Sequence, residues 1–332
     1  MDFIKDIIAR AKAQKRKLVF PEGYDVRVLA AAERVANDGV ADVVLLGCPD
    51  TIAKLATDEG IDLTQVDIVD PQKDPRFDLL AEKFYEQRKE KGISLEDARH
   101  ILSGESNLYY AGMLLKEGQV DGCVAGAANT TGDVIRAAIQ TVGMSPGINR
   151  VSSSIFVVTA FENLGEKGVF LMADVAVNPD PDERDLAEIA VSSAQTYQAI
   201  MKKQPKVAML SFSTKGSAEH PAVAKVREAT MQAKILCPDL LIDGELQIDP
   251  AVDPKSASRK APGSPVAGQA NVLVFPDLGA ANIGSKMPQV IGGAKPIGPL
   301  VQGVDKPFND LSRSCKVDDI VVLAAMTSLQ AG

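Results

Sequence analysis

Short apolar runs alternate with amphipathic segments along most of the chain. Apolar residues recur at helical spacing over residues 3–16, and a short run typical of a buried strand follows at 18–20. A helical pattern over 26–37 and another apolar run at 43–46 continue the alternation. A short apolar run followed by an amphipathic helix is typical of a βαβ unit, so the pattern predicts parallel sheets covered by helices.

The alternation extends towards the C-terminal end of the chain. Further helices are expected at 50–58, 76–91, 95–103, 107–117, 130–141, 182–202, 220–236 and 318–330, and further strands at 123–126, 154–160, 168–177, 206–212, 240–246 and 272–275. This order of elements predicts an α/β fold of three-layer α/β/α units with largely parallel sheets.

The chain of 332 residues exceeds what one hydrophobic core usually covers, so we expect two domains. The pattern breaks at 144–147, and a second crossing is expected near 296–299. The terminal helix would then return to the first domain. We therefore expect a first α/β domain of residues 1–147 plus 299–332 and a second of residues 148–298.

Composition and charge exclude several classes of function. The net charge of −8 argues against non-specific binding to nucleic acid or to an anionic membrane. No run of about 18 apolar residues occurs, so no membrane span is expected. The four cysteines form no C-x-x-C pair and only two histidines accompany them, so no metal site is expected. Scattered cysteines suit a reducing cytoplasm.

A segment rich in small and hydroxyl residues, 126–136, follows one predicted strand. In open α/β sheets ligands bind at the carboxyl ends of strands, and the start of a helix offers backbone N–H groups to an anion. Arg136 would lie in the second turn of that helix and could form a bidentate contact with a phosphate. An ordinary turn capped by Thr130 or Thr131 explains the same residues equally well.

Polar residues also follow strands in the second half of the chain. Residues 211–217 are rich in hydrogen-bond donors, and 243–247 carries two acids. Acids at such positions often orient loops instead of contacting a substrate. We therefore expect structural roles for Glu245 and Asp277.

No nucleotide-binding fingerprint is present in the sequence. No G-x-G-x-x-G opens a helix after a predicted strand, and a G-x-S-x-G elbow is absent. The stretch 279–286 comes near a P-loop, but its lysine is one place late and Pro288 would interrupt the helix that should follow. We interpret this near-match as coincidence.

The polar, irregular segment 307–317 is the most informative, and it precedes an amphipathic helix. Asp318 is well placed to cap that helix or to occupy its first turn, which leaves the adjacent Asp319 without a structural explanation. With Ser312 and Arg313 nearby, a hydroxyl, a guanidinium and a carboxylate could converge on one cleft.

Seven motifs in chain order resemble the phosphate acetyl/butyryl transferase family, and the likeness covers essentially the whole chain. They are Asp121-Gly122 with Gly126-Ala127, Thr131 to Arg136, Ala173 to Pro179, Leu210 to Ser217, Asp243 to Gln247, Gly268 to Leu278 and Asn309 to Arg313. The last two resemble the acetyltransferase branch more than the butyryltransferase branch. Ser285 and Ser314 stand where an aromatic residue and a glycine are usual in the family.

The resemblance implies an acyltransferase of acetate metabolism that moves an acetyl group between CoA and inorganic phosphate. The reaction, acetyl-CoA + phosphate ⇌ acetyl phosphate + CoA, would proceed by direct thiol attack in a ternary complex. It also implies an isocitrate dehydrogenase-like fold with the active cleft between the domains, and a homodimer formed largely through the second domain. CoA is then a substrate, and no further cofactor is implied.

The resemblance also implies roles for individual residues. Asp319 would be the base for the thiol, Arg313 would bind the acyl phosphate, and Ser312 would steady the thiolate or the developing oxyanion. A thiol and an aspartate differ by about 4.6 units in pKa, roughly 6 kcal/mol for a full proton transfer. Burial of Asp319, a thiol pKa lowered by Arg313, or concerted transfer must close that gap. The residues assigned to substrate binding are Thr131, Arg136, Arg88, Ser312 and Arg313.

Three alternatives stand beside this reading. Phosphate butyryltransferase would perform the same chemistry on a longer acyl group. An NAD(P)-dependent decarboxylating dehydrogenase of similar fold is disfavoured, because the dinucleotide fingerprint and a carboxylate cluster for a divalent metal are missing. A non-catalytic regulatory module, of the kind fused to some malic enzymes, is disfavoured by the intact set of Ser312, Arg313 and Asp319.

Overall fold

The computed structural model describes residues 3–332 and divides them into two compact units. Unit 1 holds the chain up to Gly143 and from Val304 to its end, and unit 2 holds Met144–Gly303. The sequence placed the corresponding domain boundaries after residue 147 and before residue 299.

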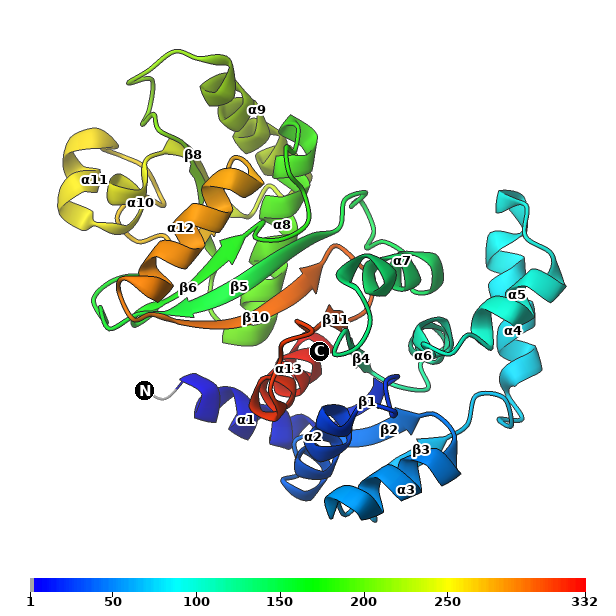
Figure 1. Cartoon of the computed structure of the whole chain (residues 1–332). Coiled ribbons are helices and arrows are strands. Elements are labelled where there is room, and N and C mark those ends of the chain that lie inside the picture. Colours follow the sequence, from blue (N-terminus) through cyan, green and yellow to red (C-terminus); the bar gives the residue numbers. More distant parts are fainter. Residues whose placement is uncertain (1–2) are drawn as a thin grey trace. The chain divides into compact units, whose positions relative to one another are not determined.

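Unit 1 is built on a five-stranded sheet in the order β11-β4-β1-β2-β3, in which every neighbouring pair is parallel (Figure 1). Its strands are β1 (Lys17–Phe20), β2 (Asp42–Leu46), β3 (Asp67–Val69), β4 (Gly122–Ala125) and β11 (Phe308–Asp310). Its helices are α1 (Phe3–Gln14), α2 (Val26–Asn37), α3 (Pro49–Glu59), α4 (Phe77–Arg88), η1 (Lys89–Lys91), α5 (Leu95–Leu102), α6 (Leu108–Lys116), α7 (Thr131–Thr141) and α13 (Val317–Gln330).

Helices cover both faces of the unit 1 sheet because its strands are apolar on both faces. Alternate strand residues, among them Val44, Leu46, Cys123 and Ala125, are buried in one cluster with residues of α4, α5, α6 and α7. The helices α1, α2 and α13 pack against one another, and α13 also contacts β4. The C-terminal helix is therefore held in the core of unit 1.

Unit 2 is built on a six-stranded sheet in the order β10-β5-β6-β9-β7-β8. The strand β5 is antiparallel to both neighbours, and the remaining pairs are parallel. Its strands are β5 (Ser152–Val158), β6 (Val169–Ala173), β7 (Lys206–Leu210), β8 (Leu241–Leu246), β9 (Val272–Val274) and β10 (Lys295–Gln302). Its helices are α8 (Glu183–Met201), α9 (Pro221–Leu236), α10 (Ile248–Val252), α11 (Pro254–Lys260) and α12 (Leu278–Val290).

The helices of unit 2 differ in how well their apolar faces are covered. The helices α8 and α9 pack side by side against the sheet, whereas α12 lies on the other face (Figure 1). Along and just beyond α12, Ile283, Met287, Val290 and Ile291 are all more than half exposed. A run of exposed large apolar side chains at this spacing is uncommon on the surface of a monomer.

The α/β fold with largely parallel sheets expected from the sequence is confirmed, but several elements were missed. The strands β3 and β11 are only three residues long, too short to stand out as apolar runs. The strand β10 contains Pro296 and Pro299, which are tolerated because it lies at the edge of its sheet. The short helices α10 and α11 were also missed. The expectation that Pro288 interrupts a helix was wrong, because it lies inside α12, which continues to Val290.

Candidate active site

The carboxyl ends of three parallel strands meet at one edge of the unit 1 sheet. The register aligns Asp310, the last residue of β11, with Ala125, the last residue of β4. The amide of Leu311 then donates to the carbonyl of Ala125 at 2.7 Å. The segment after β11, which carries Ser312 and Arg313, therefore lies beside the segment that leads from β4 into α7, where ligands bind in sheets of this type.

Glu22, which follows β1, organises the segment after β4. Its side chain is fully buried and accepts hydrogen bonds from the backbone amides of Ala127, Ala128 and Asn129 at 2.8–3.0 Å. The Asn129 side chain donates to the same carboxylate at 2.7 Å. A buried carboxylate needs such partners, and these four donors fix the course of the chain just before α7.

Arg27, near the start of α2, ties two of these segments together. Its Nη1 donates to the carbonyls of Arg313 at 2.7 Å and Cys315 at 3.1 Å, and its Nη2 donates to the carbonyl of Ala127 at 2.7 Å. Asp25 holds the other side of the guanidinium through Nε and Nη2. The sequence analysis assigned no role to Arg27, although its place in the polar segment between β1 and α2 was a signal that could have found it.

Ser312 and Arg313 are both exposed, on the segment after β11. The hydroxyls of Ser312 and Ser314 lie 2.9 Å apart, and the Ser314 amide donates to Ser312 Oγ at 3.3 Å. Within residues 3–332 the Arg313 side chain forms no ion pair, whereas its carbonyl is held by Arg27. The guanidinium is therefore positioned through its backbone and stays available to an anion.

The two acids at the start of α13 make different contacts. Asp319 Oδ2 accepts a hydrogen bond from the amide of Lys316 at 2.9 Å and so caps the helix. Asp318 Oδ1 instead lies 2.5 Å from Arg34 Nη1 on the surface. The sequence led us to expect Asp318 either to cap the helix or to occupy its first turn. It lies in the first turn, and the cap is made by Asp319, three residues after the N-cap Lys316. The second oxygen of the exposed Asp319 carboxylate has no partner in the part of the chain described.

Thr130 and Thr131, which were equal candidates for the cap of α7, have different roles in the structure. Thr130 caps the helix, since its Oγ1 accepts from the amide of Asp133 at 3.2 Å. Thr131 Oγ1 donates to Asp310 Oδ2 at 2.6 Å. Burial raises the pKa of Asp310 to about 6, with a further upward effect of Glu22 that the bond from Thr131 opposes. The Thr131 hydroxyl is thus not used for capping.

Arg136 and Arg88 come from α7 and the end of α4. Arg136 Nη1 forms an exposed ion pair with Asp133 at 2.9 Å. Burial raises the pKa of Tyr109 on α6, and both arginines act on its hydroxyl to lower it. Both positive charges therefore act on the Tyr109 hydroxyl, and the sequence did not single out that tyrosine.

Comparison with known proteins identifies the family of this chain. A family model described as phosphate acetyl/butaryl transferase matches residues 2–328. The chain belongs to this family. Phosphate acetyltransferase from Thermoanaerobacterium thermosaccharolyticum is 51% identical over 331 residues, which cover 100% of both chains.

Solved structures of the family have the same fold. EutD phosphotransacetylase from Staphylococcus aureus matches with a TM-score of 0.92 and 38% identity, over 100% of this chain and 98% of that one. A phosphotransacetylase from Streptococcus pyogenes matches with a TM-score of 0.90 and 43% identity, over 98% of each chain. The resemblance to the family seen in the seven motifs is therefore confirmed.

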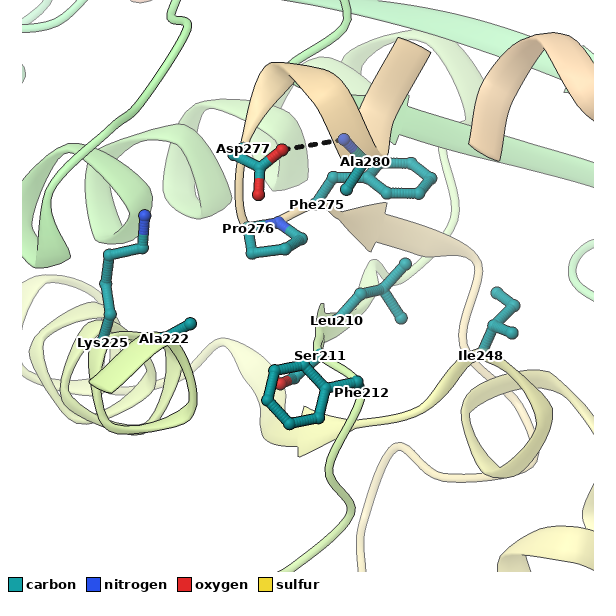
Figure 2. Close-up of a pocket in the computed structure, with 10 residues that line it drawn as sticks. All are labelled: Leu210, Ser211, Phe212, Ala222, Lys225, Ile248, Phe275, Pro276, Asp277 and Ala280. Carbon is teal, nitrogen blue, oxygen red and sulfur yellow. Dashed lines mark hydrogen bonds between the residues drawn. The ribbon is translucent and has the colours of Figure 1, made fainter. Parts of the chain in front are cut away.

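Unit 2 of this family member contains a pocket of about 380 Å³ at the carboxyl ends of β7 and β9 (Figure 2). Its wall is largely apolar and includes Leu210, Phe212 and Phe275. Asp277 lies at its edge, but its Oδ1 accepts from the amide of Ala280 at 2.8 Å and caps α12. The structural role expected for Asp277 is confirmed.

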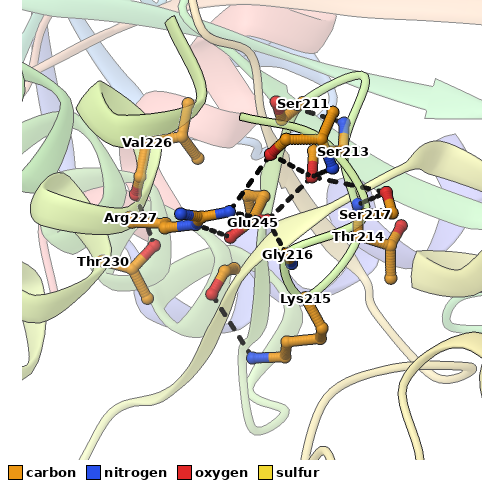
Figure 3. Close-up of polar contacts among 12 residues, drawn as sticks. Ser211, Ser213, Thr214, Lys215, Gly216, Ser217, Val226, Arg227, Thr230 and Glu245 are labelled. Carbon is orange, nitrogen blue, oxygen red and sulfur yellow. Dashed lines mark hydrogen bonds and ion pairs between the residues drawn. The ribbon is translucent and has the colours of Figure 1, made fainter. Parts of the chain in front are cut away.

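Glu245 is the centre of a buried polar network beside this pocket (Figure 3). Its carboxylate accepts from Ser213 Oγ, the Gly216 amide and Arg227 Nε, each at 2.9 Å. Burial works to raise its pKa, but these donors outweigh it and hold the pKa at about 2. The donor-rich loop 211–217 is therefore fixed by Glu245, which confirms the structural role expected for that acid.

The described residues show neither a metal-binding cluster nor a membrane-spanning helix. No group of three or more His, Cys, Asp or Glu side chains within residues 3–332 is arranged to hold a metal ion. Over the same residues no helix is both long and apolar enough to cross a membrane.

Proposed function

We propose that the chain is a phosphate acetyltransferase, which moves an acetyl group reversibly between CoA and inorganic phosphate. The observation that carries the proposal is the set of Ser312, Arg313 and Asp319 after the edge strand of unit 1, in a chain that matches the family from end to end. The relative from Thermoanaerobacterium bears the acetyltransferase name.

We propose that phosphate binds at the start of α7, with Arg136, Arg88 and Thr131 as its ligands. Arg136 and Arg88 bring two guanidiniums to the region of Tyr109. The Thr131 hydroxyl is free of the capping role, which Thr130 fills. Positive charge and backbone N–H groups at a helix start both favour an anion.

The acetyl transfer then uses the segment after β11. In the direction of acetyl-CoA synthesis, the CoA sulfur attacks the acetyl carbon of acetyl phosphate, a C–S bond forms, and the C–O bond to phosphate breaks. Arg313 would bind the acyl phosphate, and Ser312 would donate to the thiolate or to the oxyanion. Asp319 would take the thiol proton, and phosphate leaves as the product.

The position of Asp319 helps to decide among the three ways in which the thiol could lose its proton. Its side chain is exposed in the structure and one oxygen is used for capping. We therefore favour a thiol pKa lowered by Arg313, or proton transfer concerted with attack, over a base activated by burial. CoA takes part as a substrate, and the proposal requires no further cofactor.

We also propose that the enzyme is a homodimer formed through unit 2. The exposed apolar residues on and just beyond α12, Ile283, Met287, Val290 and Ile291, supply a surface of the kind that a second copy would cover. Four free cysteines, Cys48, Cys123, Cys237 and Cys315, are consistent with our proposal that the enzyme works in the reducing cytoplasm.

The test is an assay with acetyl-CoA and phosphate that follows the freed thiol. We expect thiol release that depends on phosphate and needs neither added nicotinamide nor metal. Butyryl-CoA in place of acetyl-CoA tests the alternative of phosphate butyryltransferase, and a higher kcat/KM with butyryl-CoA would overturn the acetyl assignment. Release that needs a nicotinamide cofactor would instead support the dehydrogenase alternative.

A further inference from the structure

Asp310 is the last residue of β11, and its carboxyl is buried in an unusual way. The side chain is only 4% exposed, and within the described chain its one hydrogen-bond partner is Thr131, whose Oγ1 lies 2.6 Å from Oδ2. The other oxygen, Oδ1, is buried without a partner. A buried carboxylate with one oxygen unpaired is costly, and the cost falls when the carboxyl is protonated and neutral.

The space around Oδ1 depends on Gly126. This glycine has φ +101°, and a β-carbon added to it would lie 2.1 Å from Asp310 Oδ1. Any side chain at 126 would therefore displace the carboxyl from Thr131. The position of the Asp310 carboxyl therefore requires a glycine at residue 126, just after β4.

We propose that Asp310 is a positioning residue that decides whether the Thr131 hydroxyl donates or accepts a hydrogen bond, and so tunes phosphate binding at the start of α7. The inference rests on the proposed function, because it takes the ligand of Thr131 to be phosphate. An ionised Asp310 accepts the Thr131 proton, which leaves only lone pairs of Oγ1 for the ligand. A protonated Asp310 donates to Oγ1, which frees the Thr131 proton for a phosphate oxygen.

The pKa of Asp310, about 6, puts the change within an accessible pH range. Burial is the largest cause of the raised value, and Glu22 adds to it. Other charged groups on neighbouring elements are Arg27 on α2, Asp133 and Arg136 on α7, Arg313 on the following loop, and Asp319 on α13. Asp310 is then mostly protonated below pH 6, so anion binding is tighter there and weakens as pH rises.

The probe is inorganic sulfate, which stays fully ionised over this pH range and whose binding can be followed by calorimetry without turnover. For the native enzyme we expect the Kd for sulfate to rise roughly tenfold between pH 5 and pH 7.5, since one hydrogen bond to a charged group is lost. Asp310→Asn should bind sulfate with a Kd that is flat over the range. Asp133→Asn, which removes a nearby carboxylate that does not contact Asp310, should keep the native pH profile whatever its overall affinity.

Thr131→Val separates hydroxyl orientation from simple repulsion between sulfate and the Asp310 carboxylate. If the proposal holds, Thr131→Val binds sulfate more weakly and its Kd does not change with pH. If repulsion alone acts, the variant keeps a pH dependence, with its midpoint moved upward because the Thr131 bond lowers the Asp310 pKa. That result, or an unchanged profile in Asp310→Asn, would overturn the proposal.

The thiol-release assay keeps this inference distinct from the proposed function. An enzyme that turns over acetyl-CoA and phosphate but shows no pH switch in sulfate binding contradicts the role of Asp310 alone. A protein with the switch but without phosphate-dependent thiol release contradicts the proposed function and leaves the anion site standing. Thermal unfolding of each variant at pH 7 checks that the fold is kept.

Discussion

The guanidinium of Arg27 donates a 2.7 Å hydrogen bond to the backbone carbonyl of Arg313, 286 residues later in the chain. The same side chain holds the carbonyl of Ala127. A single arginine near the start of α2 therefore fixes both of the segments that carry the proposed site.

Replacement of Arg27 should therefore disturb catalysis through Arg313. We expect Arg27→Ala to lower kcat/KM by roughly tenfold to a hundredfold, the scale of losing about 1 Å of positioning. The unpaired carbonyls should also reduce the free energy of unfolding by about 1–3 kcal/mol. Steady-state kinetics and urea unfolding measure the two effects. Arg27→Lys keeps the charge, but its single nitrogen cannot replace the two guanidinium nitrogens that hold Arg313 and Ala127, so full activity in this variant would contradict the positioning role.

The two acids at the start of α13 form a matched pair for testing the base. Asp319→Asn should lower kcat by orders of magnitude, because it removes the proposed acceptor of the thiol proton. The loss of charge from the capping box should cost only about 0.5–1 kcal/mol of stability. Single-turnover thiol release reports the chemical step. Near-normal turnover in Asp319→Asn would exclude this residue as the base.

Asp318→Asn is the control for that experiment. Its ion pair with Arg34 is largely exposed, so the substitution should change stability by about 0–1 kcal/mol and leave kcat close to the native value. A deep loss of kcat in Asp318→Asn would move the role of base to that residue.

Arg313→Ala should also lower kcat by orders of magnitude while the fold survives. The exposed side chain contributes no ion pair within residues 3–332, so the melting temperature should stay near that of the native protein. Calorimetric melting and thiol release, measured on the same preparation, separate the two effects. A large drop in melting temperature would show instead that the side chain supports the fold.

Acid should destabilise the protein through Glu245. Its pKa is about 2 in the folded state and near its ordinary value of 4.5 when unfolded. The native state therefore gains stability above pH 4.5 that is lost as pH falls from 4.5 towards 2. Glu245→Gln should be less stable than the native protein at pH 7 and should lose less stability over that acid range. Denaturant unfolding at several pH values tests this, and parallel curves for the two proteins would contradict it.

The surface of α12 gives a test of the proposed dimer. Met287→Glu places a charge on an exposed apolar surface, so it should weaken association without destabilising the protomer. Sedimentation velocity at several concentrations measures the change. Leu79→Glu, at an exposed apolar position of unit 1, is the matched control and should leave the oligomeric state unchanged. A native protein that sediments as a monomer would contradict the proposed dimer outright.

The sequence predicted the long elements because each buries an apolar face. Periodicity placed α8, α9 and α13 to within a few residues. It missed β11, whose three residues include the polar Asn309 and Asp310. Both are buried in the structure, but two adjacent polar residues do not form the apolar run by which a strand is recognised in a sequence.

The candidate site was predicted in its residue types more than in its connections. Ser312, Arg313 and Asp319 were chosen as candidates because they lie in or next to a polar, irregular segment just before an amphipathic helix. The capping role of Asp319, the hold of Arg27 on Arg313 and the contact of Thr131 with Asp310 join residues that are distant in sequence or differ only by a side-chain orientation. The contacts of Arg27 with Arg313 and of Thr131 with Asp310 depend on the register of β11 beside β4, which periodicity does not give, whereas the capping contact of Asp319 is local.

The chain leaves unit 1 and re-enters it at one place. The amide of Asp305 donates to the carbonyl of Gly143 at 3.0 Å, so the two crossing points lie side by side. Unit 2 is thus an insertion in the chain of unit 1 whose ends lie close together, and every residue that we propose for chemistry belongs to unit 1. Joining Gly143 to Val304 would need a linker of only a few residues, and the entropy of closing so short a loop is small. The two units are therefore joined at a single seam, which a short linker could replace.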